Sequence, residues 1–452
     1  MSKKPSESKG TAPDPLLGMP LSHHFFRIIL GLFVILILFN ALGNSSLSPD
    51  EESLWDNTIA VGVARVNITP SVPILMSGYA TRTEPFRGVN DEIFAAATVF
   101  DDGSSRAVLI TAEIIGFSHT AWDELTQRIE SETGIPREFI MLAPVHNHGG
   151  PSTRVYENST DADLLAYNKE LQDKLVAVIA EAASNLQPAL IGAGKGTCKM
   201  SMNRRAPAAN GGIRLGRNPY GPCDQEVGVV RFDKPDGTPF SIFVNWPTHA
   251  TVMGWQNYMI TGDWPGAARR HIESGFTTPV VATITAGASG DIDPIYRVSP
   301  DFSAGEAEEI GIDLGGEVIR VAGQITTTRA NSVNALQRVI TLPGKKTGGE
   351  GQAGTDFEPG PDVDVRLSLL RIGNIMLAGV SGELFTEIGM QIKELSPYRY
   401  TFVLTHCNGA SGYLITDQAY KEGGYEVTAS RIMPGAEKMI VSNIVDMISE
   451  IN

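Results

Sequence analysis

Two histidines stand one residue apart in the stretch APVHNHGGP, residues 143–151. The apolar run Phe139–Leu142 directly before them predicts a strand. Side chains two positions apart on an extended chain point the same way, so His146 and His148 can face one site together. Imidazole is a common metal ligand and carries protons near neutral pH. The same pair also fits two turn histidines at a strand end, and this stretch alone leaves both interpretations open.

Five apolar runs in the sequence lead into polar, glycine-rich turns. They are Leu142 before His146, Phe243 before His249, Ile284 before Ser289-Gly290-Asp291, Ala378 before Gly382-Glu383, and Leu404 before Cys407-Asn408-Gly409. In open α/β folds, ligand sites gather beyond the carboxyl ends of strands, so we expect these turns to share one pocket. Two histidines, a glutamate and one more oxygen donor can complete a four-coordinate zinc site there.

The elements that must position these turns are visible in the hydrophobic periodicity. Predicted strands cover Ile59–Ile68, Ala107–Phe117, Phe139–Leu142, Val227–Phe232, Phe240–Trp246, Val280–Thr285, the hairpin Val365–Val380 turning at Gly373-Asn374, and Tyr400–Leu404. Predicted helices cover Thr120–Thr133, Asp163–Leu186, Phe385–Leu395 and a C-terminal helix ending in Ile451. This alternation predicts an α/β fold of layered mixed β-sheets flanked by helices, a single large domain with its active site at strand carboxyl ends. The Gly- and Pro-rich stretch 343–362 predicts an exposed loop that can serve as a lid.

Composition and charge narrow the class of protein. The formal net charge is −15, which argues against a nucleic-acid partner because phosphates require a basic surface. Three cysteines are too few and too scattered for a disulfide scaffold or a thiolate zinc site. One disulfide, between Cys198 and Cys223, stays open for a protein outside the cytosol.

The N-terminal region predicts membrane targeting. Residues 1–27 form a Lys-, Ser- and Pro-rich tail that we expect to be disordered and cytoplasmic. Residues 28–43 are an uncharged apolar run, and an acidic linker follows at 44–57. Basic residues before the run and acidic residues after it place the domain at 58–452 outside the cytoplasm, in a periplasmic or extracellular space. The run predicts a single signal-anchor segment, or a signal peptide whose cleavage would give a secreted protein.

Six blocks of sequence, in order from Ile59 to near the end of the chain, resemble the neutral/alkaline ceramidases. They are VHNHGGP, the NRR at Asn203–Arg205, NWPTHATVMG with TGDWPG, ASGDIDP, SGELFTEIG, and CNGASGYLITDQAYKEGGYE. Each block alone is weak, but six in order indicate the fold and the superfamily. Members of this family split the amide of N-acylsphingosine into a fatty acid and a sphingoid base.

The resemblance implies a set of functional residues. One zinc ion per chain would be bound by His146, His249, Glu383 and Tyr413. His148 would lie beside the metal and donate to the substrate carbonyl or its developing oxyanion, and Arg204 would be a second polar contact in the pocket. Structural alternatives exist for three of these positions: Glu383 also fits a helix N-cap, Tyr413 a core aromatic, and Arg204 a solvated pair with Arg205.

One position departs from the family. Where the ceramidases have the serine assigned as the nucleophile, this chain has Asp293. A carboxylate there can act as general base for zinc-bound water, contact a substrate amine or hydroxyl, or bind a second metal. Asp291 and Asp293 also fit turn carboxylates that bond their own backbone, and Ser289 could supply a hydroxyl instead. The sequence ends soon after the last block, before the family's C-terminal immunoglobulin-like domain, so contact with a membrane would depend on the N-terminal segment.

These expectations describe a zinc-dependent hydrolase that cleaves the amide of an N-acyl sphingoid base or a related N-acyl compound. A metal-bound water would attack, Asp293 would take its proton, and His148 with Arg204 would stabilise the oxyanion. Because Asp293 replaces the serine, two alternatives stay open: a hydrolase of the same fold acting on a non-lipid amide or ester, and a non-catalytic surface protein that binds a ligand. The expected partners are a small-molecule or lipid amide substrate and, through the N-terminal segment, a membrane.

Overall fold

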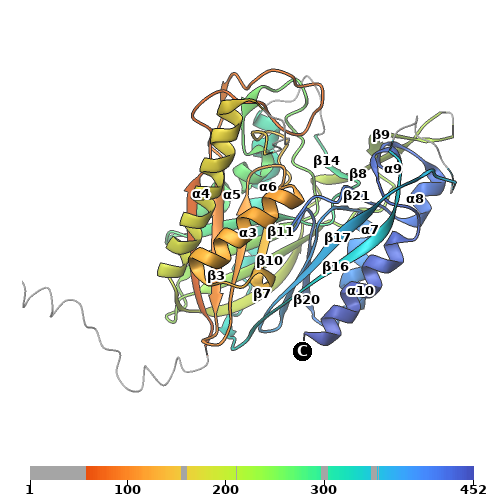
Figure 1. The fold of residues 1–452 in the computed structure, drawn as a ribbon. Coiled ribbons are helices and arrows are strands. Elements are labelled where there is room, and N and C mark those ends of the chain that lie inside the picture. The colour runs from red at the N-terminus through yellow and green to blue at the C-terminus, as the bar shows by residue number, and fades with distance from the viewer. Residues whose placement is uncertain are drawn as a thin grey trace, which may run out of the picture. The chain divides into compact units, whose positions relative to one another are not determined.

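Three β-sheets in the computed structural model carry the turns with the candidate residues (Figure 1). The structure describes residues 58–153, 160–209, 211–296, 304–347, 354 and 356–451. The predicted tail, apolar segment and linker at 1–27, 28–43 and 44–57 lie outside these ranges. No helix within the described ranges is long and apolar enough to cross a membrane. The described part of the chain forms one compact unit, in agreement with the predicted single domain.

The first sheet has the strand order β5-β4-β3-β1-β6. Its strands are β1 (Ala60–Asn67), β3 (Phe94–Asp101), β4 (Arg106–Ala112), β5 (Ile140–Pro144) and β6 (Gln187–Pro188). Helices α3 (His119–Thr133) and α4 (Ala162–Ser184) cover one face, and the 3-10 turn η1 (Arg137–Phe139) leads into β5. Because β4 and β5 run parallel, their carboxyl ends reach the same edge, where the turn with His146 follows.

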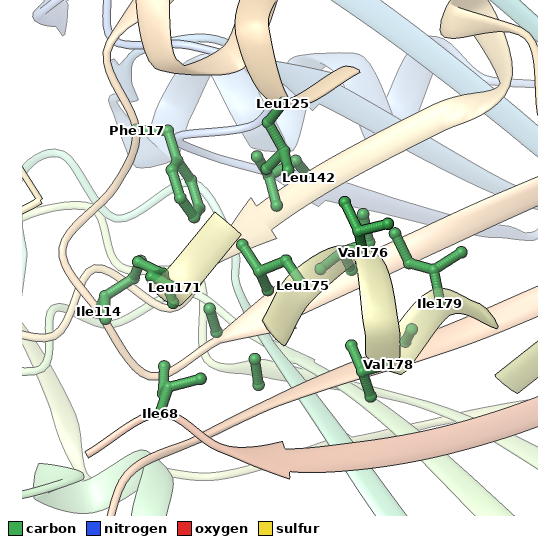
Figure 2. Packing of buried hydrophobic residues seen from close by; sticks show 14 of the residues in the cluster. Ile68, Ile114, Phe117, Leu125, Leu142, Leu171, Leu175, Val176, Val178 and Ile179 are labelled. Carbon is green, nitrogen blue, oxygen red and sulfur yellow. The ribbon is translucent and has the colours of Figure 1, made fainter. Parts of the chain in front are cut away.

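The apolar stripe of α4 fixes this helix on the first sheet. Leu171 and Leu175 are one helical turn apart and buried. Figure 2 shows them packed among Ile68, Leu142 and other buried residues of the same cluster. Burying each such side chain stabilises the fold by about 1.5–3 kcal/mol. The helix predicted over Asp163–Leu186 is confirmed, and its apolar stripe packs against the strand that leads to His146.

The second sheet has the strand order β13-β11-β10-β7-β15. Its strands are β7 (Leu190–Thr197), β10 (Glu226–Asp233), β11 (Pro239–Trp246), β13 (Val281–Ala286) and β15 (Thr328–Arg329). Helices α5 (Asp263–Ser274) and α6 (Ala304–Ala322) pack on it through a shared apolar cluster. β11 and β13 run parallel, which brings His249 and the turn at Ser289 to one edge.

The third sheet has the strand order β16-β17-β18-β20. Its strands are β16 (Val333–Lys345), β17 (Pro359–Ile372), β18 (Ile375–Val380) and β20 (Tyr400–Leu404). Helices α7 (Thr386–Leu395) and α10 (Ala436–Glu450) pack against it, and the short helices α8 (Asp417–Glu422) and α9 (Tyr425–Ala429) precede α10. β18 and β20 run parallel, so the turn with Glu383 and the turn after Leu404 also share an edge.

Three small sheets align side chains from distant parts of the chain. Their strands are β2 (Gly88–Val89) with β12 (Met259–Ile260), β8 (Ser201–Pro207) with β9 (Ile213–Asn218) and β14 (Ile292–Pro294), and β19 (Glu383–Leu384) with β21 (Tyr413–Leu414). β14 pairs with β8, which places Asp293 on the strand beside the one that carries Arg204. The parallel pair β19 and β21 sets Glu383 directly opposite Tyr413.

The three large sheets share one apolar core. Phe100 comes from the first sheet, Phe243 from the second, and Leu377 and Phe402 from the third, and all are buried in one cluster. The rings of Phe243 and Phe402 lie 6.0 Å apart. The three strand edges that carry the turns are therefore fixed relative to one another by side-chain packing.

The predicted α/β class is confirmed, as is each predicted strand and helix in approximate position. β4 ends at Ala112 rather than at Phe117, because the chain turns away from the sheet there. The periodicity missed β3 and α6. The first is rich in alanine, which has weak strand preference, and the second contains four glycines, which disfavour a helix, so tertiary packing decides both.

The prediction of an exposed loop over 343–362 is wrong at both ends. Residues 343–345 belong to β16 and 359–362 to β17, and Lys345 is buried. Gly344 and Gly360 pair across the hairpin at a register shift. A Cβ on Gly344 would collide with the carbonyl oxygen of Pro361, so the glycine permits close approach of the strands. Residues 348–353 and 355 lie outside the described ranges, and a lid function stays a prediction.

The possible disulfide between Cys198 and Cys223 is not formed. Both thiols, and that of Cys407, are free. Cys198 is buried in the apolar cluster of the second sheet, while the sulfur of Cys223 lies 3.5 Å from the hydroxyl of Ser201.

Candidate metal centre

His146 is oriented by the backbone of its turn. It follows β5 in the left-handed conformation, with φ 58°, and is buried. Its Nδ1 lies 2.9 Å from the carbonyl oxygen of Ile115. A carbonyl only accepts, so Nδ1 carries the proton and Nε2 keeps a lone pair that points into the centre. This is the tautomer that binds a metal through Nε2.

His249 is held in the same way from the second sheet. Its Nδ1 lies 2.7 Å from the carbonyl oxygen of Ser289 and 3.1 Å from that of Ile292. The indole N–H of Trp264 donates to the backbone carbonyl of His249, and the imidazole is fully buried. Its Nε2 therefore also keeps a lone pair. The turn at Ser289 contributes to the site by orienting His249 through the backbone carbonyl of Ser289, not through a side chain.

Glu383 completes a triangle of donor atoms. Its Oε2 lies 3.7 Å from Nε2 of His146 and 3.4 Å from Nε2 of His249. Ligand atoms about 2.0–2.1 Å from a tetrahedral zinc lie roughly 3.4 Å from one another, which these spacings match. Oε2 is buried and finds no hydrogen-bond donor among the described residues. Two imidazole nitrogens facing an unsatisfied carboxylate oxygen fit a divalent metal ion.

His148 lies beside this triangle. Its Nε2 is 3.2 Å from Nε2 of His146, and because the latter has the lone pair, His148 is the donor between them in the metal-free protein. Its ring meets that of Tyr79 edge-on at 5.0 Å. Arg82 donates to the backbone carbonyl of His148 at 2.5 Å and to that of Asn257 at 3.0 Å. The predicted place of His148 next to the metal ligands matches these distances, while its role in a reaction stays a prediction.

Tyr413 reaches the centre from β21. It is 8% exposed, and its hydroxyl accepts a hydrogen bond of 3.0 Å from Nη2 of Arg204. Burial raises the pKa of Tyr413 well above its ordinary value, and the neighbouring carboxylate of Glu383 raises it further. The phenol therefore stays protonated without a metal, and direct ligation by Tyr413 stays a prediction.

Arg204 is buried and bonds several residues of the centre, whereas a solvated pair with Arg205 would leave it exposed. Its Nε donates to Oε1 of Glu426 at 2.8 Å. Its Nη1 lies 3.3 Å from both Nε2 of His249 and Oδ1 of Asp293. Arg205 is buried as well and donates to the other oxygen of Glu426 at 3.0 Å. The solvated-pair interpretation is wrong, because both guanidinium groups are buried and share the Glu426 carboxylate, while Asp293 and Glu422 supply further negative charge.

Asp293 and Asp291 have different surroundings. Asp293 is buried on β14, where its Oδ1 also accepts from the hydroxyl of Thr251 at 3.4 Å, so Arg204 joins this carboxylate to the metal centre. Asp291 accepts from the backbone N–H of Thr386 at 2.9 Å and from the side-chain amide of Asn203 at 2.9 Å. Both of these partners lie on other elements rather than in its own turn, so Asp291 links its turn to α7 and β8.

Electrostatics favour metal binding at neutral pH. Burial lowers the pKa of His146 to about 4, an effect that the Glu383 carboxylate only partly offsets, and burial also lowers the pKa of His148 well below its ordinary value. Burial raises the pKa of Glu383, but the imidazoles of His146, His249 and His406 outweigh it and hold this pKa well below its ordinary value. The neutral imidazoles of His146 and His148 thus face an ionised carboxylate, which is the protonation state that binds a metal.

Sequence reasoning missed two residues of the centre. His406 stacks on the ring of His146, with centroids 3.6 Å apart and planes 8° apart. Glu426 is fully buried against Arg204. The signal for His406 was its place in the fifth predicted turn, directly before Cys407. Glu426 gave no such signal, because a glutamate in a short helix usually lies on the surface.

Comparisons with known proteins agree with this fold. The family described as "Neutral/alkaline non-lysosomal ceramidase, N-terminal" matches residues 59–301, more than half of the chain. A neutral ceramidase of Oryza sativa subsp. japonica is 25% identical over 258 residues, covering 55% of this chain and 32% of the relative. A neutral ceramidase of Pseudomonas aeruginosa is 23% identical over 288 residues, covering 58% and 42%. The match thus spans about a third to two fifths of the length of these relatives.

The solved structures extend the likeness to most of the chain. The crystal structure of neutral ceramidase from Pseudomonas aeruginosa superposes with a TM-score of 0.72 at 18% identity, covering 86% of this chain and 74% of that one. A structure titled "Ceramidase complexed with C2" gives a TM-score of 0.71 at 18% identity. The layered α/β fold is therefore shared with these proteins. Together with the sequence match over residues 59–301, it follows that the chain belongs to the neutral/alkaline non-lysosomal ceramidase family.

Proposed function

We propose that this chain is a zinc-dependent hydrolase that cleaves a linear amide bond. The observation that carries the proposal is the triangle of donor atoms at Nε2 of His146, Nε2 of His249 and Oε2 of Glu383. Both imidazoles have their protons on Nδ1, and the spacings suit one tetrahedral ion, with Tyr413 as the proposed fourth ligand. A bound zinc ion would supply Lewis acidity towards a carbonyl and would lower the pKa of a water molecule.

The surrounding residues have roles that follow from their contacts. We propose Asp293 as the general base that takes the proton of the attacking water, because it is buried at the edge of the centre and held by Arg204 and Thr251. Arg204 and His148 are hydrogen-bond donors on either side of the triangle, so they are suited to stabilise a developing oxyanion. In this arrangement a carboxylate performs proton transfer and no protein nucleophile is required.

The proposed substrate is the amide of an N-acyl sphingoid base or a related N-acyl compound. Support comes from the family and from the named activity of its curated relatives. Asp293 on β14, which stands where the ceramidases have a serine, favours a second candidate, a hydrolase acting on a non-lipid amide or ester. Fatty acid released from N-acylsphingosine supports the first; activity confined to water-soluble amides or esters supports the second. Turnover of neither class, with metal bound, would leave a ligand-binding surface protein.

Variants of the full chain test the assigned roles. Purified protein should retain about one zinc ion after dialysis, and His249→Ala should lose it. Asp293→Asn should keep the zinc and lose about 10²–10⁴-fold in kcat. Ser289→Ala is the comparison variant, since its buried hydroxyl has no hydrogen-bond partner among the described residues and its contact with His249 is made by its backbone carbonyl. Wild-type protein without metal would refute the proposal, and loss of activity in Ser289→Ala but not in Asp293→Asn would reassign the role of Asp293.

We also propose that residues 28–43 anchor the chain in a membrane with residues 58–452 outside the cytoplasm. The support is the apolar run and the charge difference across it. Protease added to intact cells should digest the domain if it is exposed at the cell surface, or only after the outer membrane is opened if it is periplasmic. Protection in both conditions would contradict this placement.

A further inference from the structure

His406 brings a fourth imidazole to the centre. It follows β20, is 6% exposed and has φ 54°, a backbone conformation that is uncommon outside glycine. Its N–H donates to the carbonyl oxygen of Gly382 at 3.0 Å, and the hydroxyl of Thr405 donates to the same oxygen at 2.5 Å. These bonds tie the turn of His406 to the turn that carries Glu383. The turn is thus built to hold the imidazole where it lies.

Nε2 of His406 is buried without a hydrogen-bond partner in the described part of the chain. The same is true of Oε2 of Glu383, which the proposed zinc ion already accounts for. Leaving a buried polar atom unsatisfied costs about 1–3 kcal/mol, so such atoms usually have a partner that is not protein. One ring nitrogen each from His146 and His406 lies within 4.8 Å of the other and of a Glu383 oxygen. Imidazole nitrogens around a carboxylate are typical ligands of a transition metal.

One ion cannot satisfy both stacked rings. The lone pairs of parallel imidazoles lie in separate parallel planes, so they cannot converge on a point about 2 Å from each nitrogen. Nδ1 of His146 is already bonded to Ile115, so His146 binds only through Nε2. Parallel rings can instead present lone pairs to two neighbouring ions. The ring centroids lie 3.6 Å apart, which is compatible with two ions separated by about 3.5–4 Å, as in two-metal sites.

We propose that this centre binds a second divalent transition-metal ion, held by His406 and by Glu383, whose carboxylate is shared between the two ions. The inference rests on the proposed zinc site at His146, His249 and Glu383. The second position has one imidazole and one shared carboxylate, so water or substrate must fill its other places. It should therefore bind more weakly than the first and fill only at higher free metal concentration.

Metal stoichiometry tests the second site directly. Full-length protein is dialysed to equilibrium against Zn²⁺ at increasing free concentrations, and bound zinc is measured per chain. The wild type should bind one ion tightly and a second at least tenfold more weakly. His406→Ala should bind one ion with unchanged tight affinity, which also shows that the variant is folded. His271→Ala, which removes an imidazole that lies on α5 against Gly315 of α6, is the matched control and should still bind two.

A spectroscopic readout gives an independent check. In Co²⁺- or Mn²⁺-loaded wild type, two ions bridged by a carboxylate should show magnetic coupling in electron paramagnetic resonance. His406→Ala and His406→Gln should show only the uncoupled signal. Saturation of the wild type at one ion, or two ions in both His406 variants, would overturn the assignment. No bound ion at any concentration would instead refute the proposed zinc site itself.

Discussion

At the scale of single residues, the centre depends on charges that are buried in pairs. Glu426 is fully buried and bonds Nε of Arg204 and Nη1 of Arg205, so it fixes the guanidinium group that faces His249 and Asp293. Removing one partner of a buried ion pair leaves the other charge uncompensated, which is strongly destabilising locally. Glu426 is thus a positioning residue for Arg204.

Glu426→Gln should lower kcat about tenfold to hundredfold while the zinc content stays unchanged, because Arg204 loses its orientation but no metal ligand is touched. Glu422→Gln is the matched control, since Glu422 bonds Arg205 and Gln418 but not Arg204, and its side chain is 39% exposed. Steady-state kinetics and metal analysis on both variants check this. Equal loss of kcat in the two variants, or loss of zinc in Glu426→Gln, would contradict the positioning role.

Buried imidazoles also predict how the metal-free protein responds to pH. The pKa of His146 is about 4 in the folded state because of burial, against about 6.5 when the chain is unfolded. As the pH falls, the unfolded state therefore takes up this proton before the folded state does. Acidification from about pH 6.5 to pH 4 lowers the free energy of unfolding by about 3 kcal/mol for this one group. Above pH 6.5 the group leaves the free energy of unfolding unchanged. Asp291 opposes this trend, because burial raises its pKa to about 7.

His146→Gln isolates this contribution. A chelator keeps both proteins free of metal, and the midpoint urea concentration of unfolding is measured at each pH. As the pH is lowered from 6.5 to 4.5, this midpoint should fall more steeply for the wild type than for the variant. The contribution of Asp291 is common to both proteins and cancels in the comparison. Parallel midpoint curves would mean that His146 does not carry the assigned shift.

At the scale of elements, the site depends on close approach between turns. Gly290 donates its N–H to the carbonyl oxygen of Leu384, and a Cβ on Gly290 would lie 2.5 Å from the carbonyl oxygen of Glu383. Gly290→Ala should therefore push β19 away and weaken zinc binding at least tenfold. Gly316→Ala is the control, because Gly316 lies in α6 with open space around it and alanine is the better helix former by about 1 kcal/mol. Gly290→Ala should lower both the zinc affinity and the melting temperature, whereas Gly316→Ala should keep the zinc affinity of the wild type. An unchanged zinc affinity in Gly290→Ala would show that β19 can shift without cost.

The elements also show what a sequence can predict here. His146, His249 and Glu383 could be placed together because each follows a strong apolar run, and because the carboxyl ends of parallel strands share an edge. β16 was missed because its exposed and buried positions mix polar and apolar residues. Glu426 could not be predicted, since its partners Arg204 and Arg205 lie more than two hundred positions away and only the packed fold joins them.

At the scale of the whole molecule, the centre exists only where the three sheets meet. His146 and His249 come from the part of the chain before β16, while Glu383 and Tyr413 come from the part after it. Asn408 joins the two parts, because its side chain accepts from the N–H of Leu142 at 2.8 Å and donates to the carbonyl of Ile140 at 3.0 Å. The shared apolar core also draws on all three large sheets.

Dividing the chain between residues 331 and 332, ahead of β16, should therefore give two fragments that neither fold fully nor bind zinc alone. Each fragment would expose its half of the shared core to water, with Phe243 in the first fragment and Phe402 in the second. Coexpression should restore a soluble complex with about one tightly bound zinc ion, because packing rather than chain continuity holds the edges together. Asn408→Ala in the second fragment should weaken this complementation, since two buried backbone groups of β5 would lose their partner at about 1–3 kcal/mol each. Copurification and metal analysis measure both effects, and tight zinc binding by the first fragment alone would show that Glu383 is not needed for the site.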